Sequence, residues 1–349
     1  QPGAINDVIA AAAADETPWS EATLEARVGR LAPVIEAAVA AAIEETTEIF
    51  AAADAANGCD AETDATPAPP ACAVETRFLM MAGREQPPES VLAQLAFGFA
   101  LVEADPRYVG VNIAFPEHDP ISVRDYSLHM RLFAFVAARH PDVPMSLHAG
   151  ELAPGLVPPR DMRFHIREAV EVAGADRIGH GVDIASEDDA IALLEHMAAA
   201  RIPVEVCLTS NSTILNVRGA DHPLHLYLAY GVPVVLATDD EGVSRGEMTN
   251  EYERAVTEQG LAYSQLRTMA RASLAYAFVD GESLFAPDGA IQSACRGEVG
   301  GEPSAACASF LGASPKARLQ WRLEADLAAF ERELLASGLA EAAARAGAG

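Results

Sequence analysis

Short apolar runs alternate with longer stretches of helical periodicity along most of this chain. Six runs rich in branched apolar residues each predict a strand, and they cover residues 73–81, 108–114, 144–149, 177–182, 203–210 and 232–239. Between them, apolar residues recur at helical spacing over 90–104, 123–139, 162–173, 186–200 and 222–230. Because these strands are apolar throughout, both faces of their sheet are expected to be buried, which is typical of parallel sheets. The pattern predicts an α/β fold.

Polar residues stand where most of the later predicted strands end. In a closed barrel the carboxyl ends of all strands surround one mouth, whereas an open sheet spreads them along an edge. A barrel would therefore bring these polar residues together, and we expect a (β/α)8 TIM-type barrel. Such a barrel has eight strands, so the two strands that are not found are expected to precede Gln1. The polar residues at the strand ends are His148 with Glu151, His180, Ser210 with Asn211, and Asp239 with Asp240.

The two ends of the chain have a different pattern. Residues 24–53 predict one or two amphipathic helices, and a polar insertion rich in Pro follows them. After position 244 the chain is mostly helical, over 249–259, 263–277 and 315–336. We therefore divide the chain into an N-terminal helical segment with its insertion (1–72), a barrel core with the catalytic mouth (73–284), and a loop insertion with a C-terminal helix (285–349).

Charge narrows the range of partners. The 349 residues include 24 Lys and Arg against 51 Asp and Glu, a formal net charge of −27 at pH 7. A field of that sign repels phosphate backbones and anionic lipids, so nucleic acid is not an expected partner. No apolar run reaches the roughly 18 residues that a membrane-spanning helix needs. The expected partner is a small molecule, and the pattern says nothing of oligomeric state.

Four of the five cysteines form two local pairs, Cys59 with Cys72 and Cys295 with Cys307. Each pair brackets a polar loop rich in Gly or Pro, and neither has the close spacing of a zinc ribbon. Short disulfide clips of this kind belong to an oxidising compartment, so we expect a periplasmic or secreted protein. The alternative is a cytoplasmic protein whose surface thiols are free. Cys207 lies in an apolar run and is expected to be a small buried residue.

Three strand ends carry candidate chemistry. In SLHAGEL a histidine precedes a carboxylate by three residues, and Ala149 and Gly150 allow a sharp turn between them. In RIGHG the glycines beside His180 would let a ligand approach the backbone closely. In VVLATDDEGVSR two carboxylates directly follow an apolar strand, an arrangement that is costly unless a cation or a shared proton compensates it. A single histidine could be an ordinary hydrogen-bonded residue, and TDD could be a helix N-cap. Three such endings together indicate a catalytic mouth.

These motifs resemble one known family. SLHAGE, RIGHGV, EVCLTSN and VPVVLATDDEGV, in this order and spacing, look like the adenosine deaminase family of the metal-dependent amidohydrolase superfamily. The resemblance covers roughly residues 73–284 and is closer to the bacterial adenosine deaminase-like and secreted deaminase-growth-factor branch. It implies a barrel that holds one zinc ion at its carboxyl mouth. The implied reaction is hydrolysis of adenosine or 2'-deoxyadenosine at C6 of the purine, with release of ammonia and formation of inosine from adenosine.

The resemblance also implies a role for each matched residue. His148 and Asp239 would be zinc ligands, and Asp239 would also polarise the attacking water. Glu151 would donate a proton to purine N1, and His180 would orient the attacking hydroxide. Asp240 would hydrogen-bond purine N7. The chemistry is consistent, since zinc lowers the pKa of its water toward about 7 and protonation of N1 makes C6 electrophilic.

Two features depart from the family pattern. The first strand of the family supplies two zinc ligands as an HxH pair, and the nine histidines of this chain contain no such pair. We expect these two ligands upstream of residue 1, on the strands that are also missing. The second departure is Phe115 and Pro116, which stand where many members have a glycine that contacts purine N3. We therefore expect Phe115 and Gly150 to contact substrate together with Asp240.

Other residues and other functions stay open. His118, His222 and His225 could line the mouth or simply be exposed, whereas the histidines within helical patterns are expected at the surface. The latter are His129, His140, His165 and His196. Another purine, such as adenine, an N6-substituted adenosine or a nucleotide, is an alternative substrate. If the missing HxH pair is genuine, the barrel could instead be a noncatalytic binding scaffold.

Overall fold

The computed structural model describes residues 2–59, 69–286, 289–297, 299 and 301–338. Residues 60–68, which hold much of the predicted insertion, and the C-terminal 339–349 lie outside them. Two compact units make up the chain, Gln1–Gly260 and Leu261–Gly349. The division into 1–72, 73–284 and 285–349 stays a prediction. The two units are described separately below.

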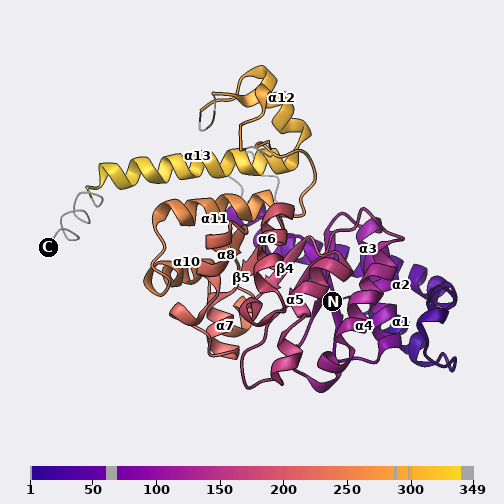
Figure 1. Ribbon diagram of the computed structural model, residues 1–349. Coiled ribbons are helices and arrows are strands. Elements are labelled where there is room, and N and C mark those ends of the chain that lie inside the picture. Colours follow the sequence, from indigo (N-terminus) through magenta and orange to yellow (C-terminus); the bar gives the residue numbers. More distant parts are fainter. Residues whose placement is uncertain (1, 60–68, 287–288, 298, 300, 339–349) are drawn as a thin grey trace. The chain divides into compact units, whose positions relative to one another are not determined.

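Six parallel strands form the centre of the first unit (Figure 1). β1 pairs with β2, and β3, β4, β5 and β6 pair in sequential order. A parallel bridge between Val111 and Met145 connects β2 to β3, so the order along the chain is also the order in space. The strands are β1 (Phe78–Gly83), β2 (Tyr108–Ala114), β3 (Ser146–Ala149), β4 (Arg177–His180), β5 (Val204–Val206) and β6 (Val234–Leu236).

Helices separate consecutive strands, as the apolar periodicity predicts. Parallel strands need such crossovers, because the chain must return to the same end of the sheet. The sequential strand order and the alternation with helices are those of part of a (β/α)8 barrel, and the predicted fold class is confirmed. The crossover helices are α3 (Pro88–Ala104), α4 (Pro120–Ala137), α5 (His165–Glu168) with a π-helical turn (Ala169–Ala173), α6 (Ala190–Ala200), α7 (Leu208–Ile214) and α8 (Leu224–Tyr230).

The predicted strand at 203–210 is wrong in its second half. β5 ends at Val206, and Leu208–Ile214 form helix α7. The reason lies in the neighbouring strand, because β6 ends at Leu236, which is the partner of Val206. Beyond that point no neighbouring strand remains to pair with, and the chain turns into a helix after Cys207, which is buried as predicted. Ser210 and Asn211 are therefore held by a helix.

Helix α3 lies at the centre of the packing in the first half of this unit. It contacts β1, β2, α1 (Ile5–Ala13), α2 (Leu24–Asn57) and α4. Every residue from Ser90 to Phe99 is buried, which explains why the helix is apolar on most sides instead of along one stripe. The unit ends with α9 (Glu241–Ser244) and α10 (Met248–Thr257).

The second unit is helical in the residues that the structure describes. It contains α11 (Tyr263–Ala275), α12 (Ala305–Ala313) and α13 (Pro315–Ala336). Its core includes Leu284, Leu311 and Trp321, and the disulfide between Cys295 and Cys307 is buried among them.

Both predicted cysteine pairs are bonded. Cys295 and Cys307 lie 4.6 Å apart at their Cα atoms, and Cys59 and Cys72 in the first unit lie 5.5 Å apart. The remaining cysteine, Cys207, is free. The cysteine spacing therefore predicted both clips.

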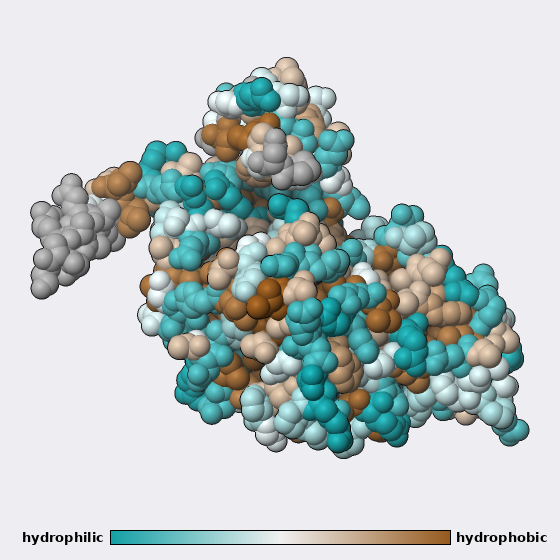
Figure 2. Space-filling model, viewed as in Figure 1, coloured by the Kyte–Doolittle hydropathy of each residue, from teal (hydrophilic) through white to brown (hydrophobic). Residues whose placement is uncertain are grey.

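The surface is rich in polar side chains. Figure 2 shows a face that is mostly hydrophilic, with apolar residues in small separate patches. Across the ranges that the structure describes, none of the helices combines the length and the apolar character that crossing a membrane requires.

Candidate active site and metal centre

Three predicted site residues from three strand ends converge. His148 lies near the end of β3, His180 is the last residue of β4, and Asp239 follows β6. One potential ligand atom from each lies within 4.8 Å of the other two. The rings of His148 and His180 are 4.7 Å apart at their centroids. The sheet order places these carboxyl ends side by side, as expected for the mouth of a barrel.

The backbone is strained at this mouth. Phe115, His180 and Asp239 have φ values of 75°, 67° and 55°, in the left-handed region that side chains other than glycine rarely adopt. Each such residue costs on the order of 1–3 kcal/mol, and such strain clusters at functional sites. All three belong to the candidate site that the sequence predicts.

His148 is oriented by Asn112 on β2. The Oδ1 atom of Asn112 accepts hydrogen bonds from the backbone N–H of Ile113 (2.7 Å) and of His148 (3.2 Å), and it lies 3.1 Å from Nδ1 of His148. Since two backbone donors identify this atom as the oxygen, Nδ1 of His148 must carry the proton. The lone pair of the imidazole is then on Nε2, which is the state that a metal-binding histidine needs.

Glu151 has the electrostatic environment of a carboxylic acid that stays protonated near neutral pH. Burial raises its pKa to about 8, and the charges of Glu117 and Asp239 act in the same direction, while Arg84 opposes them. One oxygen of Glu151 lies 3.8 Å from Nε2 of His180. Glu151 therefore has a pKa that suits a general acid and lies close to His180.

A buried ion pair, which the sequence reasoning missed, supports the turn between His148 and Glu151. Arg84 and Glu117 are fully buried, with Nη1 and Oε2 3.3 Å apart. Arg84 also donates to the carbonyl of His148 (2.7 Å). Glu117 accepts the backbone N–H groups of Gly150 and Glu151 at 2.9 Å each. The pair thus holds both ends of the turn that presents Glu151.

The charge of Glu117 is stabilised by its partners. Burial alone would raise its pKa, but Arg84 and a hydrogen bond from His165, at 2.5 Å, lower it to about 2. A carboxylate whose pKa falls on folding adds stability above its unfolded pKa, here about 4.5, and loses it as pH falls toward 2. The shift corresponds to about 3 kcal/mol at neutral pH.

We expect Glu117→Gln to lower the free energy of unfolding by about 3–5 kcal/mol at pH 7, because it leaves Arg84 buried without a counter-charge. The difference from wild type should shrink between about pH 4.5 and pH 2, where Glu117 itself becomes protonated. Urea unfolding at several pH values measures it. Glu21→Gln, which breaks the exposed pair with Arg131, is the control and should cost no more than about 1 kcal/mol. Equal effects of the two variants would contradict the role given to Glu117.

Gly150 is required by both conformation and space. Its φ is +74°, and a Cβ atom there would lie 2.5 Å from Oδ1 of the buried Asp183. Gly155 has a φ of +98° and nothing within 4 Å of the equivalent position. Substitution of the two glycines can therefore distinguish the free-energy cost of backbone strain, which both sites share, from the cost of a steric clash, which only Gly150 has.

We expect Gly150→Ala to destabilise the protein by several kcal/mol, because it adds overpacking to the backbone strain. Gly155→Ala should cost only the strain, on the order of 1 kcal/mol. Thermal or urea unfolding of both variants measures the difference. Equal stability losses would show that the space beside Gly150 is not restrictive.

The remaining predicted substrate contacts lie around the mouth. Asp240 is exposed and precedes α9, but its side chain makes no capping hydrogen bond there, so the N-cap interpretation of TDD is not supported. The charge of Asp239 raises the pKa of Asp240. Phe115 is 47% exposed, and its ring lies 3.3 Å from the position of a Cβ on Gly83 at the end of β1.

The other histidines divide into two groups. His118 and His225 are exposed, whereas His222 is buried and hydrogen-bonded to Asn211. The prediction of surface positions is wrong for His129 and His165, both of which are fully buried, and it is confirmed for His196. His140 is partly buried.

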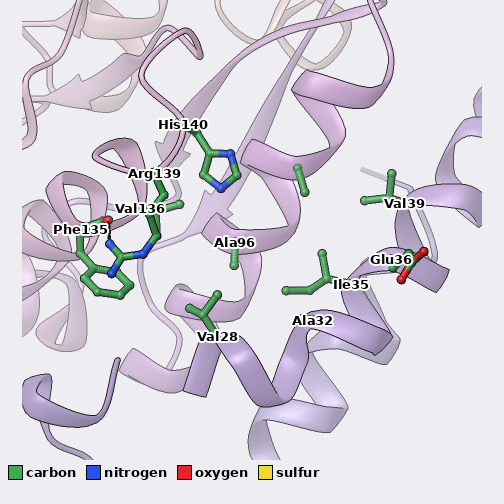
Figure 3. Close-up of a pocket in the computed structure, with 11 residues that line it drawn as sticks. Val28, Ala32, Ile35, Glu36, Val39, Ala96, Phe135, Val136, Arg139 and His140 are labelled. Carbon is green, nitrogen blue, oxygen red and sulfur yellow. Dashed lines mark hydrogen bonds between the residues drawn. The ribbon is translucent and has the colours of Figure 1, made fainter. Parts of the chain in front are cut away.

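An apolar pocket elsewhere in the first unit contains none of the predicted site residues. It lies among α2, α3 and α4 and has a volume of about 340 Å³ (Figure 3). Ile35 and Ala96 are among its lining residues, while Glu36, Arg139 and His140 contribute its polar groups. The pocket lacks the donor set of the strand-end site.

Comparison with known proteins agrees with the strand-end motifs. The sequence model of the family described as Adenosine deaminase matches residues 30–284. The chain belongs to the adenosine deaminase family. The family predicted from the four motifs is therefore confirmed, and the match begins well before the first of them.

The curated relatives match only part of this chain. The adenosine deaminase of Erwinia tasmaniensis is 37% identical over 151 residues, which are 42% of each chain. The adenosine deaminase of Salmonella heidelberg is 41% identical over 152 residues, again 42% of each chain. The chain thus spans about two fifths of the length of the curated relatives it matches.

Two solved structures that match part of this chain are named as deaminases in their titles. An adenine deaminase from Arthrobacter aurescens is 26% identical with a TM-score of 0.45, and the match covers 58% of this chain and 57% of that one. An N6-methyl-AMP deaminase from Arabidopsis thaliana is 27% identical with a TM-score of 0.47, covering 58% and 54%.

The donor set suits a zinc ion in part. Imidazole nitrogen and carboxylate oxygen are common zinc ligands, and His148 and Asp239 supply one of each. A zinc site usually has three or four protein ligands, and no HxH pair exists among the nine histidines. The residues that meet at the strand ends therefore fit part of the donor set of a zinc site.

Proposed function

We propose that this protein is a zinc-dependent deaminase that hydrolyses adenosine or 2'-deoxyadenosine at C6 of the purine, releasing ammonia. The observation that carries the proposal is the meeting of His148, His180 and Asp239 with the buried Glu151, whose pKa burial raises, at the carboxyl ends of parallel strands. Perturbed carboxyl groups beside potential metal ligands are typical of catalytic sites. Family membership supports the same reaction class.

His148 and Asp239 would hold the metal ion. The Nε2 lone pair of His148 is available, since Nδ1 is engaged by Asn112. When bound, zinc supplies an ionised water near neutral pH, which is the nucleophile that hydrolysis needs.

The side chains around the metal have separate tasks. Burial raises the pKa of Glu151 to about 8, so Glu151 can donate a proton to purine N1 and so make C6 electrophilic. His180 can hydrogen-bond the attacking oxygen. Asp240, which directly follows the proposed metal ligand Asp239, can form a hydrogen bond with purine N7. The exposed ring of Phe115 can cover one side of the base.

A different purine is the main alternative substrate. Structures with similar folds are named for adenine and for N6-methyl-AMP. The net charge of −27 disfavours a phosphorylated substrate, because its field repels anions. A nucleoside therefore remains our first choice. A noncatalytic scaffold would not need a buried carboxyl group with a raised pKa beside the proposed metal ligands.

The test is ammonia release by the full-length protein from adenosine, 2'-deoxyadenosine, adenine, N6-methyladenosine and AMP. We expect the highest kcat/KM with the two nucleosides. Preference for AMP or adenine would overturn the substrate assignment but keep the reaction class. Zinc binding with no turnover of any of these purines would favour a binding scaffold.

We also propose that the protein works in an oxidising compartment, outside the cytoplasm. Two disulfides, which join cysteines 13 and 12 positions apart in the sequence, support this, since the cytosol keeps such thiols reduced. Peptide mapping of freshly isolated, unreduced protein should find Cys59 joined to Cys72 and Cys295 joined to Cys307. Cys207, the free thiol, is the internal control and should be alkylated after denaturation. Alkylation of all five cysteines without reduction would contradict the proposal.

A further inference from the structure

Three buried polar side chains form a hydrogen-bonded row that runs from the mouth to the start of α8. Nδ1 of His180 lies 3.0 Å from Nδ2 of Asn211, and Oδ1 of Asn211 lies 3.1 Å from Nε2 of His222. Nδ1 of His222 in turn accepts the backbone N–H of Leu224 at 3.1 Å. His180, Asn211 and His222 are 1%, 0% and 3% exposed, so water does not offer substitute partners.

The direction of every hydrogen bond in this row follows from its last member. A backbone N–H can only donate, so Nδ1 of His222 must be the unprotonated nitrogen and Nε2 must carry the proton. That proton needs an acceptor, which identifies the nearer atom of the Asn211 amide as its oxygen. The amide nitrogen then faces His180 and donates to Nδ1. His180 is left with its proton on Nε2.

Two further observations support this direction. Burial lowers the pKa of His222 to about 4, so His222 is neutral at physiological pH and has a single ring proton. The backbone of Asn211 is anchored in α7, because its N–H donates to the carbonyl of Cys207 and its carbonyl accepts from Leu215 and Val217. The row therefore ends at His222 on a backbone N–H that can only donate, and its middle residue, Asn211, is held in place by the hydrogen bonds of its own backbone.

The two neighbouring histidines of the mouth differ as a result. Asn112 presents its oxygen to Nδ1 of His148, which leaves a lone pair on Nε2. Asn211 presents its nitrogen to Nδ1 of His180, which leaves a proton on Nε2. One histidine can bind a metal through Nε2, and the other can donate a hydrogen bond from Nε2.

We propose that Asn211 and His222 are positioning residues that fix the tautomer of His180, so that His180 turns an Nε2–H toward the mouth. The inference rests on the proposed function only for the identity of the oxygen that receives this hydrogen bond. Within the structure, an oxygen of Glu151 lies 3.8 Å from that Nε2. Of the three potential ligands that converge at the mouth, His180 is then a hydrogen-bond donor, and His148 and Asp239 are the metal ligands.

The direct test is the 15N spectrum of the histidine rings in metal-free, full-length protein, because protonated and unprotonated ring nitrogens resonate at well-separated frequencies. We expect an unprotonated Nδ1 and a protonated Nε2 for His180, and the opposite pattern for His148. A protonated Nδ1 on His180 in the wild type would overturn the proposal without any variant being needed.

Asn211→Asp reverses the polarity of the row at nearly constant shape. Aspartate offers only acceptors, so Nδ1 of His180 should become protonated and its 15N signal should move accordingly. Asn216→Asp adds the same charge at an exposed position just beyond α7 and should leave the His180 signals unchanged. If Asn211 has only a structural role, the Asn211→Asp variant should be less stable but its His180 Nδ1 signal should not move. That result would overturn the proposal.

Replacements of His222 provide a second test. Unlike Asn211→Asp, they introduce no buried charge into the hydrogen-bonded row. His222→Gln can still donate to Asn211, whereas His222→Leu cannot and leaves the amide free to turn. We expect a single His180 tautomer in the Gln variant and a mixture in the Leu variant. The same pattern in both variants would remove His222 from the assignment.

Turnover gives a separate reading. With adenosine we expect Asn211→Asp to lower kcat by about 10²-fold or more, with a much smaller change in KM, since the wrong tautomer cannot donate in the transition state. His222→Gln should retain most of the activity that His222→Leu loses. If the wild type has the expected tautomer but deaminates no purine, the proposed function fails and the tautomer assignment stands. If the wild type deaminates adenosine with the opposite tautomer, the tautomer assignment fails and the proposed function stands.

Discussion

Replacing Glu151 by Gln is expected to leave the metal in place and to remove most of the deaminase activity. The amide preserves the shape of the side chain but cannot pass a proton to purine N1. Loss of a general acid lowers the rate by about 10²- to 10⁴-fold. The raised pKa of Glu151, which burial causes, is the feature that the substitution removes. Zinc content and ammonia release from adenosine should be measured on the same preparation.

The matched control is Glu195→Gln. Glu195 is an exposed residue of α6 and not one of the proposed site residues, so its replacement removes one carboxylate and should not alter turnover. A Glu151→Gln protein that deaminates adenosine at nearly the wild-type rate would show that another group supplies the proton. A metal-free Glu151→Gln protein would instead assign Glu151 to metal binding.

Replacing either proposed metal ligand is expected to have the opposite signature. His148→Ala and Asp239→Ala should lose metal as well as activity, because each removes a donor from a site with few of them. We expect zinc affinity to fall by more than about 10²-fold. Replacing a residue that only hydrogen-bonds to a metal ligand usually has a smaller effect.

His196→Ala, on the surface of α6, is the control for the loss of a histidine and should bind zinc as the wild type does. His180→Ala separates the ligands from the hydrogen-bond donor, since it should keep zinc while it loses turnover. Stoichiometric zinc in His148→Ala would contradict the ligand assignment.

The sequence predicts the strand-end chemistry because short motifs encode it locally. His148 and His180 lie at the ends of apolar strands and Asp239 lies just after one, which places each side chain at the same end of a parallel sheet. The cysteine pairs are local for the same reason, since each closes a short loop. Both predictions needed only neighbouring residues and a general rule of sheet geometry.

The supporting residues could not be found in this way. Arg84 and Glu117 look like ordinary surface charges in the sequence, and only the packing of β1, β2 and β3 buries them together. His165 and His222 lie in helical or loop patterns that do not reveal burial. The start of α7 depends on where β6 ends, which no pattern within 203–210 contains. Tertiary contacts decide all of these features.

The most direct test of the central claim is hydrolysis of adenosine by the full-length, zinc-loaded protein in water enriched in 18O. We predict equimolar inosine and ammonia, with 18O at C6 of the inosine, and loss of this product when a chelator removes the zinc. Adenosine that stays unchanged under these conditions, or inosine formed at an undiminished rate after complete removal of zinc, would contradict the claim.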